Sequence, residues 1–169
     1  MRRLTEKEIR GSFVNCSKGE ATRLPMPRDL DTRPWDDLDF LGWSDLSAPD
    51  RSYLVAERGN ARQGDALVGI VLRSAAGQRG YLRRSLCSFC LTQHPGSGVA
   101  LMTARKTGAA GRQGNSVGTY VCSDLACSLY LRGRKKPAVG GRIEESLTVE
   151  DQVARVRMHL ESFLDSLDA

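Results

Sequence analysis

The chain has 169 residues, of which 40% are hydrophobic and 27% are charged. These proportions are typical of one folded globular domain, so we treat residues 1–169 as a single unit with its own core. They exclude a disordered chain, a collagen and a coiled coil. No apolar run reaches the roughly 20 residues needed to cross a membrane. Because the basic N-terminal segment has no apolar stretch behind it, it does not resemble a secretory signal, and we expect a soluble, cytoplasmic protein.

The charge is unevenly distributed along the chain. Lysine and arginine number 25 against 20 acidic residues, a net charge of +5. Between residues 79 and 136 there is one acid, Asp124, and there are ten basic residues: Arg79, Arg83, Arg84, Arg105, Lys106, Arg112, Arg132, Arg134, Lys135 and Lys136. This asymmetry indicates a basic face for an acidic partner, either nucleic acid or protein. A solvated surface without a partner is the alternative.

The N-terminal third has one helix signal, followed by an acidic segment. Thr5 and Glu8 have the spacing of a capping box, which predicts a short helix over residues 9–13. The helix ends before Pro25, because proline cannot donate to a helix ladder. Residues 29–50 predict loops and short turns. We expect the aromatic residues of this segment to reach into the core: Trp35, Phe40 and Trp43.

Four segments have strand signals. Residues 53–56 and 66–72 are apolar and are separated by turn-forming residues 59–65, which predicts a hairpin. For the second segment, periodicity alone leaves a buried helix open. Residues 99–104 and 118–121 flank a glycine-rich loop with three basic residues, which we expect to be flexible. Together these segments predict an α+β fold with a small, mostly antiparallel sheet.

Two helices are predicted in the C-terminal part. Residues 125–131 follow a possible cap at Ser123 or Asp124. A longer helix over about residues 148–167 begins at Thr148 and is amphipathic. Its apolar residues repeat at steps of three and four: Val149, Val153, Val156, Leu160, Phe163 and Leu167. This stripe predicts a face that packs on the core. A helix that docks onto a partner is the alternative interpretation.

Four of the five cysteines form two close pairs. Cys87 and Cys90 are separated by two residues, and Cys122 and Cys127 by four. Without a secretory signal, such pairs favour metal binding over disulfides, and four thiolates are the ligands of a closed structural zinc site. Four reduced buried cysteines and a redox-active pair are the alternatives. Cys16 stands apart, and we expect it to be a small buried or half-buried residue.

The sequence contains little that suggests catalysis. Its two histidines are His94, which we expect to be exposed in a loop, and His159, which we expect on the solvated surface of the last helix. No nucleophile elbow, HExxH helix or phosphate-binding loop is present. We therefore predict no catalytic residue and a protein that is not an enzyme.

Several segments together resemble a known family. They are residues 9–15, residues 39–43, and the second cysteine pair within residues 118–127. The chain resembles the elongation factor G-binding proteins, the fusidic-acid-resistance (FusB-type) family, over roughly residues 4–136. The part concerned is their C-terminal treble-clef zinc-binding domain. The resemblance implies a treble-clef lobe over about residues 80–136, in which one zinc ion is held by the four paired cysteines: Cys87, Cys90, Cys122 and Cys127.

The resemblance also implies a function. Members bind elongation factor G and promote its release from the ribosome, which counters fusidic acid in the resistance proteins. Those proteins have a helical bundle ahead of the zinc domain, whereas this sequence predicts a stand-alone, monomeric zinc domain. The family's partner surface is matched here by region: Phe89, Arg105, Lys106, Arg112 and Tyr120. An ordinary loop or core role is the alternative for each.

A second function is compatible with the same basic stretch. A ribosome- or RNA-binding zinc protein would use basic residues for phosphates and aromatic residues for stacking on bases. Phe89, Tyr120 and Tyr130 are available for stacking. However, aromatic residues make up only 6% of the chain, and no strand is rich in them. We therefore rank elongation factor G binding first.

Overall fold

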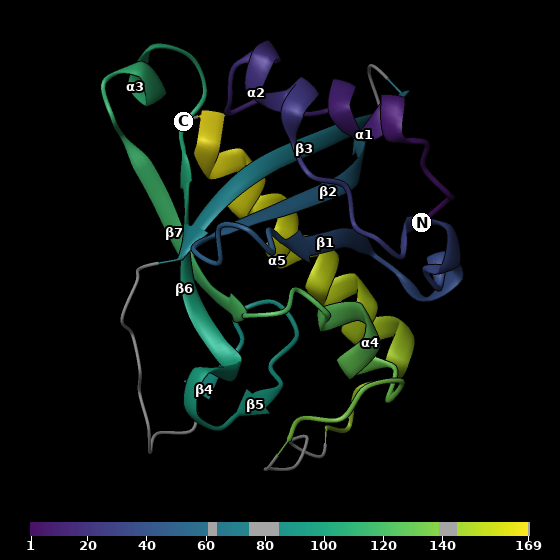
Figure 1. Ribbon diagram of the computed structural model, residues 1–169. Coiled ribbons are helices and arrows are strands. Elements are labelled where there is room, and N and C mark those ends of the chain that lie inside the picture. The colour runs from purple at the N-terminus through teal and green to yellow at the C-terminus, as the bar shows by residue number, and fades with distance from the viewer. Residues whose placement is uncertain (61–63, 75–84, 139–144, 169) are drawn as a thin grey trace.

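The computed structural model describes residues 1–60, 64–74, 85–138 and 145–168. Its centre is a five-stranded antiparallel sheet with the strand order β1-β2-β3-β6-β7 (Figure 1). The strands are β1 (Phe40–Ser44), β2 (Arg51–Asn60), β3 (Gly64–Ser74), β6 (Val99–Arg105) and β7 (Ser116–Cys122). The predicted α+β class with a mostly antiparallel sheet is confirmed.

The described helices are mostly short. They are α1 (Glu6–Gly11), α2 (Lys18–Arg23), α3 (Gly108–Arg112), α4 (Cys127–Leu131) and α5 (Val149–Asp168). Three 3₁₀ turns, η1 (Leu30–Thr32), η2 (Trp35–Asp37) and η3 (Gly96–Gly98), and a small second sheet of β4 (Ser85–Leu86) and β5 (Gln93–His94) complete the fold. None of the helices in the described ranges has the length and apolar character required to span a membrane.

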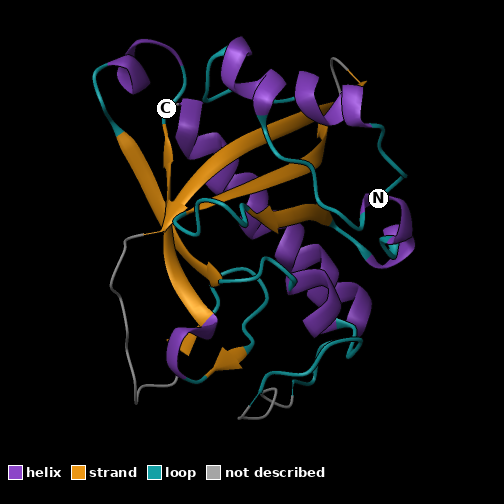
Figure 2. Ribbon diagram, viewed as in Figure 1, coloured by secondary structure: helices purple, strands orange, loops and turns teal. Residues whose placement is uncertain are grey.

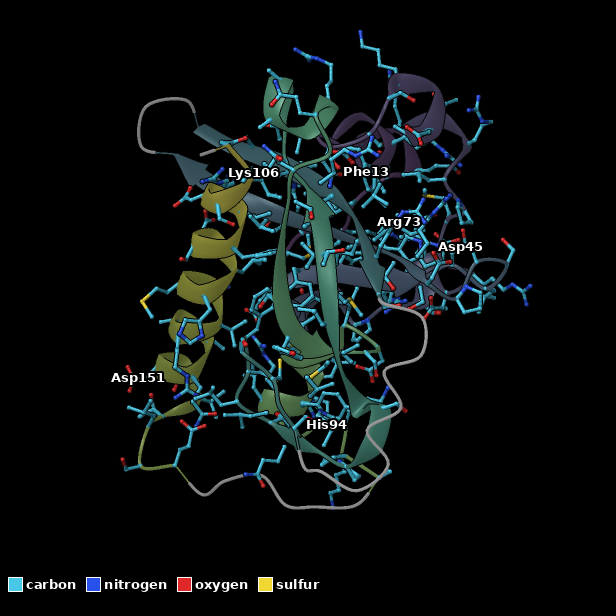
Figure 3. The ribbon with its side chains drawn as sticks, turned by 90° about the vertical axis from the view of Figure 1, so that its left-hand side faces the viewer. Phe13, Asp45, Arg73, His94, Lys106 and Asp151 are labelled. Atoms are coloured by element: carbon cyan, nitrogen blue, oxygen red, sulfur yellow. The ribbon has the colours of Figure 1, made fainter. Side chains whose placement is uncertain are left out.

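The central strands are buried on both faces, which gives the molecule three layers. Successive residues of a strand point to opposite faces, and in β2 the side chains of Leu54 and Ala56 join one apolar cluster whereas Tyr53 and Val55 join another. Helix α5 covers the first face. The N-terminal segment with α1 and α2 covers the second (Figures 2 and 3).

Helix α5 packs its apolar stripe on the sheet. Asp151 N donates to Thr148 Oγ1 over 3.2 Å, which caps the helix as expected. The buried residues of the helix join the cluster around the cysteines: Val156, Leu160, Phe163, Leu164 and Leu167. Val149 differs from the prediction, because its side chain is exposed. The stripe therefore faces the core, and the partner-docking interpretation of this helix is wrong.

The opposite face is covered by two capped helices. Thr5 and Glu8 form the predicted capping box of α1. Ser17 and Glu20 form a second capping box, which starts α2. Our sequence interpretation did not include α2, although the Ser-x-x-Glu spacing is itself a helix signal. After α1 the chain lies along β3, where Val14 N donates to Gly69 O over 2.9 Å.

Two segments are more ordered than the sequence suggested. Residues 40–44 were expected in loops, but they form the edge strand β1, whose five residues all pair with β2. The glycine-rich loop between β6 and β7 contains α3, whose Gly111 is buried. In both cases tertiary contacts override weak local propensities. The predicted hairpin of β2 and β3 is present with longer strands, and residues 61–63 of its turn lie outside the described residues.

Gly42 allows a close approach between β1 and the turn that carries the second cysteine pair. A Cβ atom at residue 42 would lie 2.4 Å from Cβ of Leu125. We expect Gly42→Ala to lower the free energy of unfolding by about 2 kcal/mol, because overpacking forces the two segments apart. Urea unfolding measures the effect. Gly11→Ala is the matched control, since nothing lies within 4 Å of a Cβ atom there.

A second substitution separates this contact from a general effect on the strand. Leu125 has φ of +54°, so glycine suits its backbone and removes the clashing Cβ atom. Leu125→Gly is itself destabilising, because it removes a buried side chain, but the double variant should lose less stability than the sum of the two single losses. Strictly additive losses in the double variant would contradict the proposed clash.

Candidate metal centre

The first cysteine pair lies in a tight turn between β4 and β5, which we call the knuckle (Ser85–His94). Ser85 pairs with His94 and Leu86 with Gln93, so the two short strands bring the ends of the turn together. Cys87 N donates to Thr92 O over 3.1 Å. This folded turn points the sulfurs of Cys87 and Cys90 to one side.

The second pair joins a strand to a helix. Cys122 is the last residue of β7, and Cys127 is the first residue of α4. Between them, Leu125 N donates to Cys122 O over 2.8 Å. The Asp124 carboxylate accepts from Ala126 N over 3.1 Å and so stabilises the turn ahead of the helix. The predicted cap at Ser123 or Asp124 is wrong, because α4 has Ala126 as its N-cap and no side chain caps it. Cys127 thus sits in the first turn of α4, where the helix dipole favours thiolate.

The four sulfurs form a compact cluster. Sγ of Cys87 is 3.6 Å from Sγ of Cys127, and Sγ of Cys90 is 3.6 Å from Sγ of Cys122. All four atoms lie within 4.8 Å of one another. Four thiolates at about 2.3 Å from a tetrahedral zinc ion are about 3.8 Å apart, so the residues fit zinc. The separations are far longer than a disulfide bond, and all four cysteines are free.

Burial makes the cluster depend on a cation. All four side chains are buried, and Cys87, Cys122 and Cys127 have no exposed surface. Hydrogen bonds from Cys122 and Cys127 lower the pKa of Cys87 and of Cys90, whereas burial raises the pKa of Cys127. Four negative charges in one buried site require a cation to offset them. The four cysteines are therefore the site of one structural zinc ion.

Polar side chains of the knuckle reach two of the sulfurs. The Thr92 hydroxyl lies 3.3 Å from Sγ of Cys90, and Nε2 of His94 lies 3.3 Å from Sγ of Cys122. Both groups can donate a hydrogen bond to a thiolate, which stabilises its charge and orients it. Our expectation of an exposed His94 is wrong: only 4% of the residue is exposed, because the pairing of β4 with β5 turns it inward.

The ring of His94 packs against Tyr130, whose hydroxyl takes part in a second set of polar contacts. It meets the ring of Tyr130 edge to face, with centroids 4.6 Å apart. The Tyr130 hydroxyl donates to Asp124 over 2.8 Å, and Nζ of Lys135 donates to the same carboxylate oxygen over 2.8 Å. Burial raises the pKa of Asp124, but the hydrogen bonds from Lys135, Ala126 N and Tyr130 together lower it below its usual value. Helix α4 is thus tied to the turn before it.

The predicted partner residues do not all lie on the surface. Phe89 is buried between Phe40 and Phe163, with ring centroids 6.2 and 6.1 Å away. It is a core residue that fixes the knuckle to the sheet and to α5, which was the stated alternative for it. We therefore remove Phe89 from the set of partner residues.

The other four predicted residues lie on the hairpin of β6 and β7. Arg105 ends β6 and Arg112 ends α3 at the hairpin tip. Lys106, beside Arg105, is half-buried. Tyr120 lies near the other end of β7 and is 51% exposed. Figure 3 shows Lys106 at the tip, at the opposite end of the hairpin from His94.

The remaining predicted residues lie away from the sulfur cluster. Cys16 is half-buried, as expected. His159 is also half-buried, although we expected a solvated side chain, and its Nδ1 is buried without a hydrogen-bond partner in the described chain. Three of the ten basic residues counted above lie outside the described residues: Arg79, Arg83 and Arg84.

A closed four-cysteine site formed by a knuckle and a helix start, set against an antiparallel sheet, defines a zinc-finger protein of the treble-clef class. Residues 8–167 match the family model of the FBP C-terminal treble-clef zinc-finger. The chain belongs to this family. No curated protein matches the chain at a significant level, and neither does any solved structure.

Proposed function

We propose that this protein binds elongation factor G, a translational GTPase, and promotes its release from the ribosome. Support comes from family membership and from the surface that the zinc site positions. The effect would be mechanical, since a binding partner shifts a conformational equilibrium only by binding one state more tightly than the other. A zinc ion that holds two distant segments in register keeps such a surface rigid.

The observation that carries this proposal is one exposed face of the β6–β7 hairpin. Leu101 is opposite Tyr120, and Arg105 is opposite Ser116. Opposite residues in an antiparallel pair share a face, as do alternate residues of one strand. Arg105 and Tyr120 therefore lie on the same face, whereas the intervening Met102 and Ala104 point into the core.

The hairpin is held at both ends. At one end Cys122 binds the zinc site, and Ser88 N in the knuckle donates to Tyr120 O over 2.7 Å. At the other end Thr107 N donates to Leu167 O over 3.0 Å, which ties the hairpin tip to the last turn of α5. Aromatic and basic side chains on a rigid element lose little conformational entropy on binding.

Several basic residues near the zinc site form ion pairs with acidic residues of this chain. Arg132, Arg134 and Lys135 are paired with Asp39, Asp37 and Asp124 at 2.6, 3.2 and 2.8 Å. These three basic residues are thus largely offset by acids. The hairpin carries the exposed Arg105 and Arg112 beside the half-buried Lys106, and we propose it as the basic docking surface for an acidic face of the factor.

Binding of RNA is the weaker candidate. Of the three aromatic residues available for stacking, Phe89 and Tyr130 are buried and only Tyr120 is exposed. Recognition of single-stranded RNA uses several bases stacked on exposed aromatic side chains. A surface with one exposed ring and a basic tip is better suited to a protein partner.

Reversing the charge of Arg105 and Lys106 to glutamate is expected to weaken binding of elongation factor G at least tenfold, without lowering the melting temperature. The physical reason is the loss of complementary charge at the interface. Affinity is measured by titration calorimetry with the purified factor. Lys7→Glu with Lys18→Glu is the matched control, since it changes the net charge equally on α1 and α2.

The partner class is tested by affinity capture from a cell lysate, with and without nuclease and over a series of salt concentrations. Elongation factor G should be retained after nuclease treatment of the lysate. Loss of every partner after nuclease, together with a steep fall of affinity with salt, would instead identify RNA as the partner. Wild-type affinity in the Arg105 and Lys106 variant would remove the hairpin tip from the docking surface.

A further inference from the structure

A cavity of about 260 Å³ lies beside α2, on the face of the sheet opposite α5. It opens where β3 and β6 diverge, below the chain that connects α1 to α2. Its polar lining comes from six segments of the chain: Asn15, Glu20, Arg51, Arg73, Thr103 with Arg105, and Ser116. None of these residues contacts the sulfur cluster, so the zinc site does not account for them.

Strand pairing brings the three arginines together. Arg51 is directly opposite Arg73 in the pairing of β2 with β3, and Arg73 is directly opposite Thr103 in the pairing of β3 with β6. Arg105 is two residues beyond Thr103 and shares its face. Figure 3 shows Arg73 on the side of the sheet away from α5. Three guanidinium groups from adjacent strands thus line one cavity.

Asn15 holds the cavity open. Its Nδ2 donates to Val71 O over 3.0 Å and to Arg105 O over 3.2 Å, and its Oδ1 accepts from Val71 N over 2.8 Å. Strand β3 pairs with β6 only from Leu72 and Ala104 onward. The Asn15 side chain therefore replaces a direct bond between the strands, which leaves space between them.

The basic side chains that line the cavity outnumber the acidic ones. Among the lining residues of the described chain, three arginines face one carboxylate, that of Glu20. Hydrogen bonds from Ser17 N and Ser17 Oγ, each 2.9 Å, already occupy this carboxylate and lower its pKa, with a further contribution from Arg51 and Arg105. Arg73 is paired with Asp50 at 3.0 Å, but both side chains are exposed, so this pair is weak.

The arginines have unused hydrogen-bonding capacity. Nε of Arg51 is buried and has no hydrogen-bond partner among the described residues. Within the same residues, the Arg105 guanidinium has no ion pair within 4.0 Å. Like charges opposite each other in a sheet destabilise it, and a buried donor without an acceptor adds to that penalty. An anion in the cavity would relieve both.

We propose that this cavity binds the phosphate group of a small organic phosphate monoester. A guanidinium fork matches phosphate oxygens, and a phosphate monoester carries nearly two negative charges at neutral pH, so three arginines attract it more strongly than they attract a single carboxylate. The lining also includes Leu24 and Val71, which suits a small organic body attached to the phosphate. The site shares Arg105 with the docking hairpin, whereas Arg51 and Arg73 lie outside that hairpin, so substitution of Arg73 tests the cavity separately from the proposed function.

The test is a titration of the full chain. Binding is measured by calorimetry and by ¹⁵N NMR of backbone amides and arginine Nε groups. The probes are inorganic phosphate, ribose 5-phosphate, ribose and acetate. We expect ribose 5-phosphate to bind at least tenfold more tightly than acetate, ribose not to bind, and the signals of Asn15 and of Arg51 Nε to shift. Arg73→Gln should weaken ribose 5-phosphate binding at least tenfold and leave elongation factor G binding unchanged.

The control is Arg112→Gln, which removes one exposed charge from the hairpin tip outside the cavity. Equal weakening by Arg112→Gln and Arg73→Gln would show diffuse charge attraction and overturn the proposal. So would acetate binding as tightly as ribose 5-phosphate, or no binding of either phosphate at about 10 mM, a concentration that would nearly saturate a site with a Kd of about 1 mM. A single-stranded RNA that displaces ribose 5-phosphate and binds more tightly would identify a nucleic-acid site instead. Because Arg73 is exposed, its substitution does not threaten folding.

Discussion

Replacing Cys122 with serine is expected to remove zinc and to unfold the segments that the metal joins. Cys122 is fully buried at the end of β7, and its Sγ is 3.6 Å from Sγ of Cys90. Three remaining thiolates bind zinc far more weakly, and the free energy of structural zinc binding, on the order of 10 kcal/mol, is also free energy of folding. Zinc content by plasma emission spectrometry and thermal melting by circular dichroism measure the loss.

Cys16→Ser is the matched control for this variant. Cys16 is half-buried and lies outside the sulfur cluster, so the control should keep one zinc ion per chain and its melting temperature. A strong chelator added to the wild-type protein should reproduce the effect of Cys122→Ser. Unchanged zinc content and melting in Cys122→Ser would contradict the four-cysteine site.

Replacing Arg132 with alanine is expected to lower the free energy of unfolding by about 3 kcal/mol, because it leaves a buried carboxylate without its main partner. The Asp39 side chain is fully buried, and Arg132 donates to both of its oxygens, over 2.6 and 3.1 Å. The backbone N–H of Asp39 donates to Ser128 Oγ over 2.9 Å. These bonds join the end of α4 to the start of β1, and urea unfolding measures their contribution.

Arg157→Ala provides the comparison. Arg157 on α5 contacts the same carboxylate at 3.3 Å, but its side chain is 61% exposed. We expect this variant to lose less than about 1 kcal/mol, because an exposed ion pair contributes little. Equal losses in the two variants would contradict the assignment of Arg132 as the main partner of Asp39.

The cysteine spacing was the most informative part of the sequence. Two close pairs with the spacing of zinc ligands predicted a single site, and the four sulfurs do come together. Such a prediction succeeds because zinc demands four ligands in a closed shell, and few arrangements of a chain supply them. Periodicity likewise predicted α5 correctly, since twenty residues contain enough turns for a stripe to be recognised.

Three of the errors share one physical cause, which is contact between distant segments, whereas α2 was missed although the capping box of Ser17 and Glu20 is a local signal. Residues 40–44 form a strand because β2 pairs with them along their whole length. Phe89 is buried because Phe40 and Phe163, far away in the chain, close around its ring. His94 is buried because β4 and β5 fold the knuckle inward. None of these contacts has a local pattern that reports it.

The sequence by itself determined the ligands of the metal site, the class of the fold and the amphipathic helix that covers one face of the sheet. These features depend on spacing and periodicity, which are local properties of the chain. Only the tertiary structure decided which basic residues face one another. Arg51, Arg73 and Arg105 meet at one cavity, because strand register places residues from distant parts of the chain opposite each other.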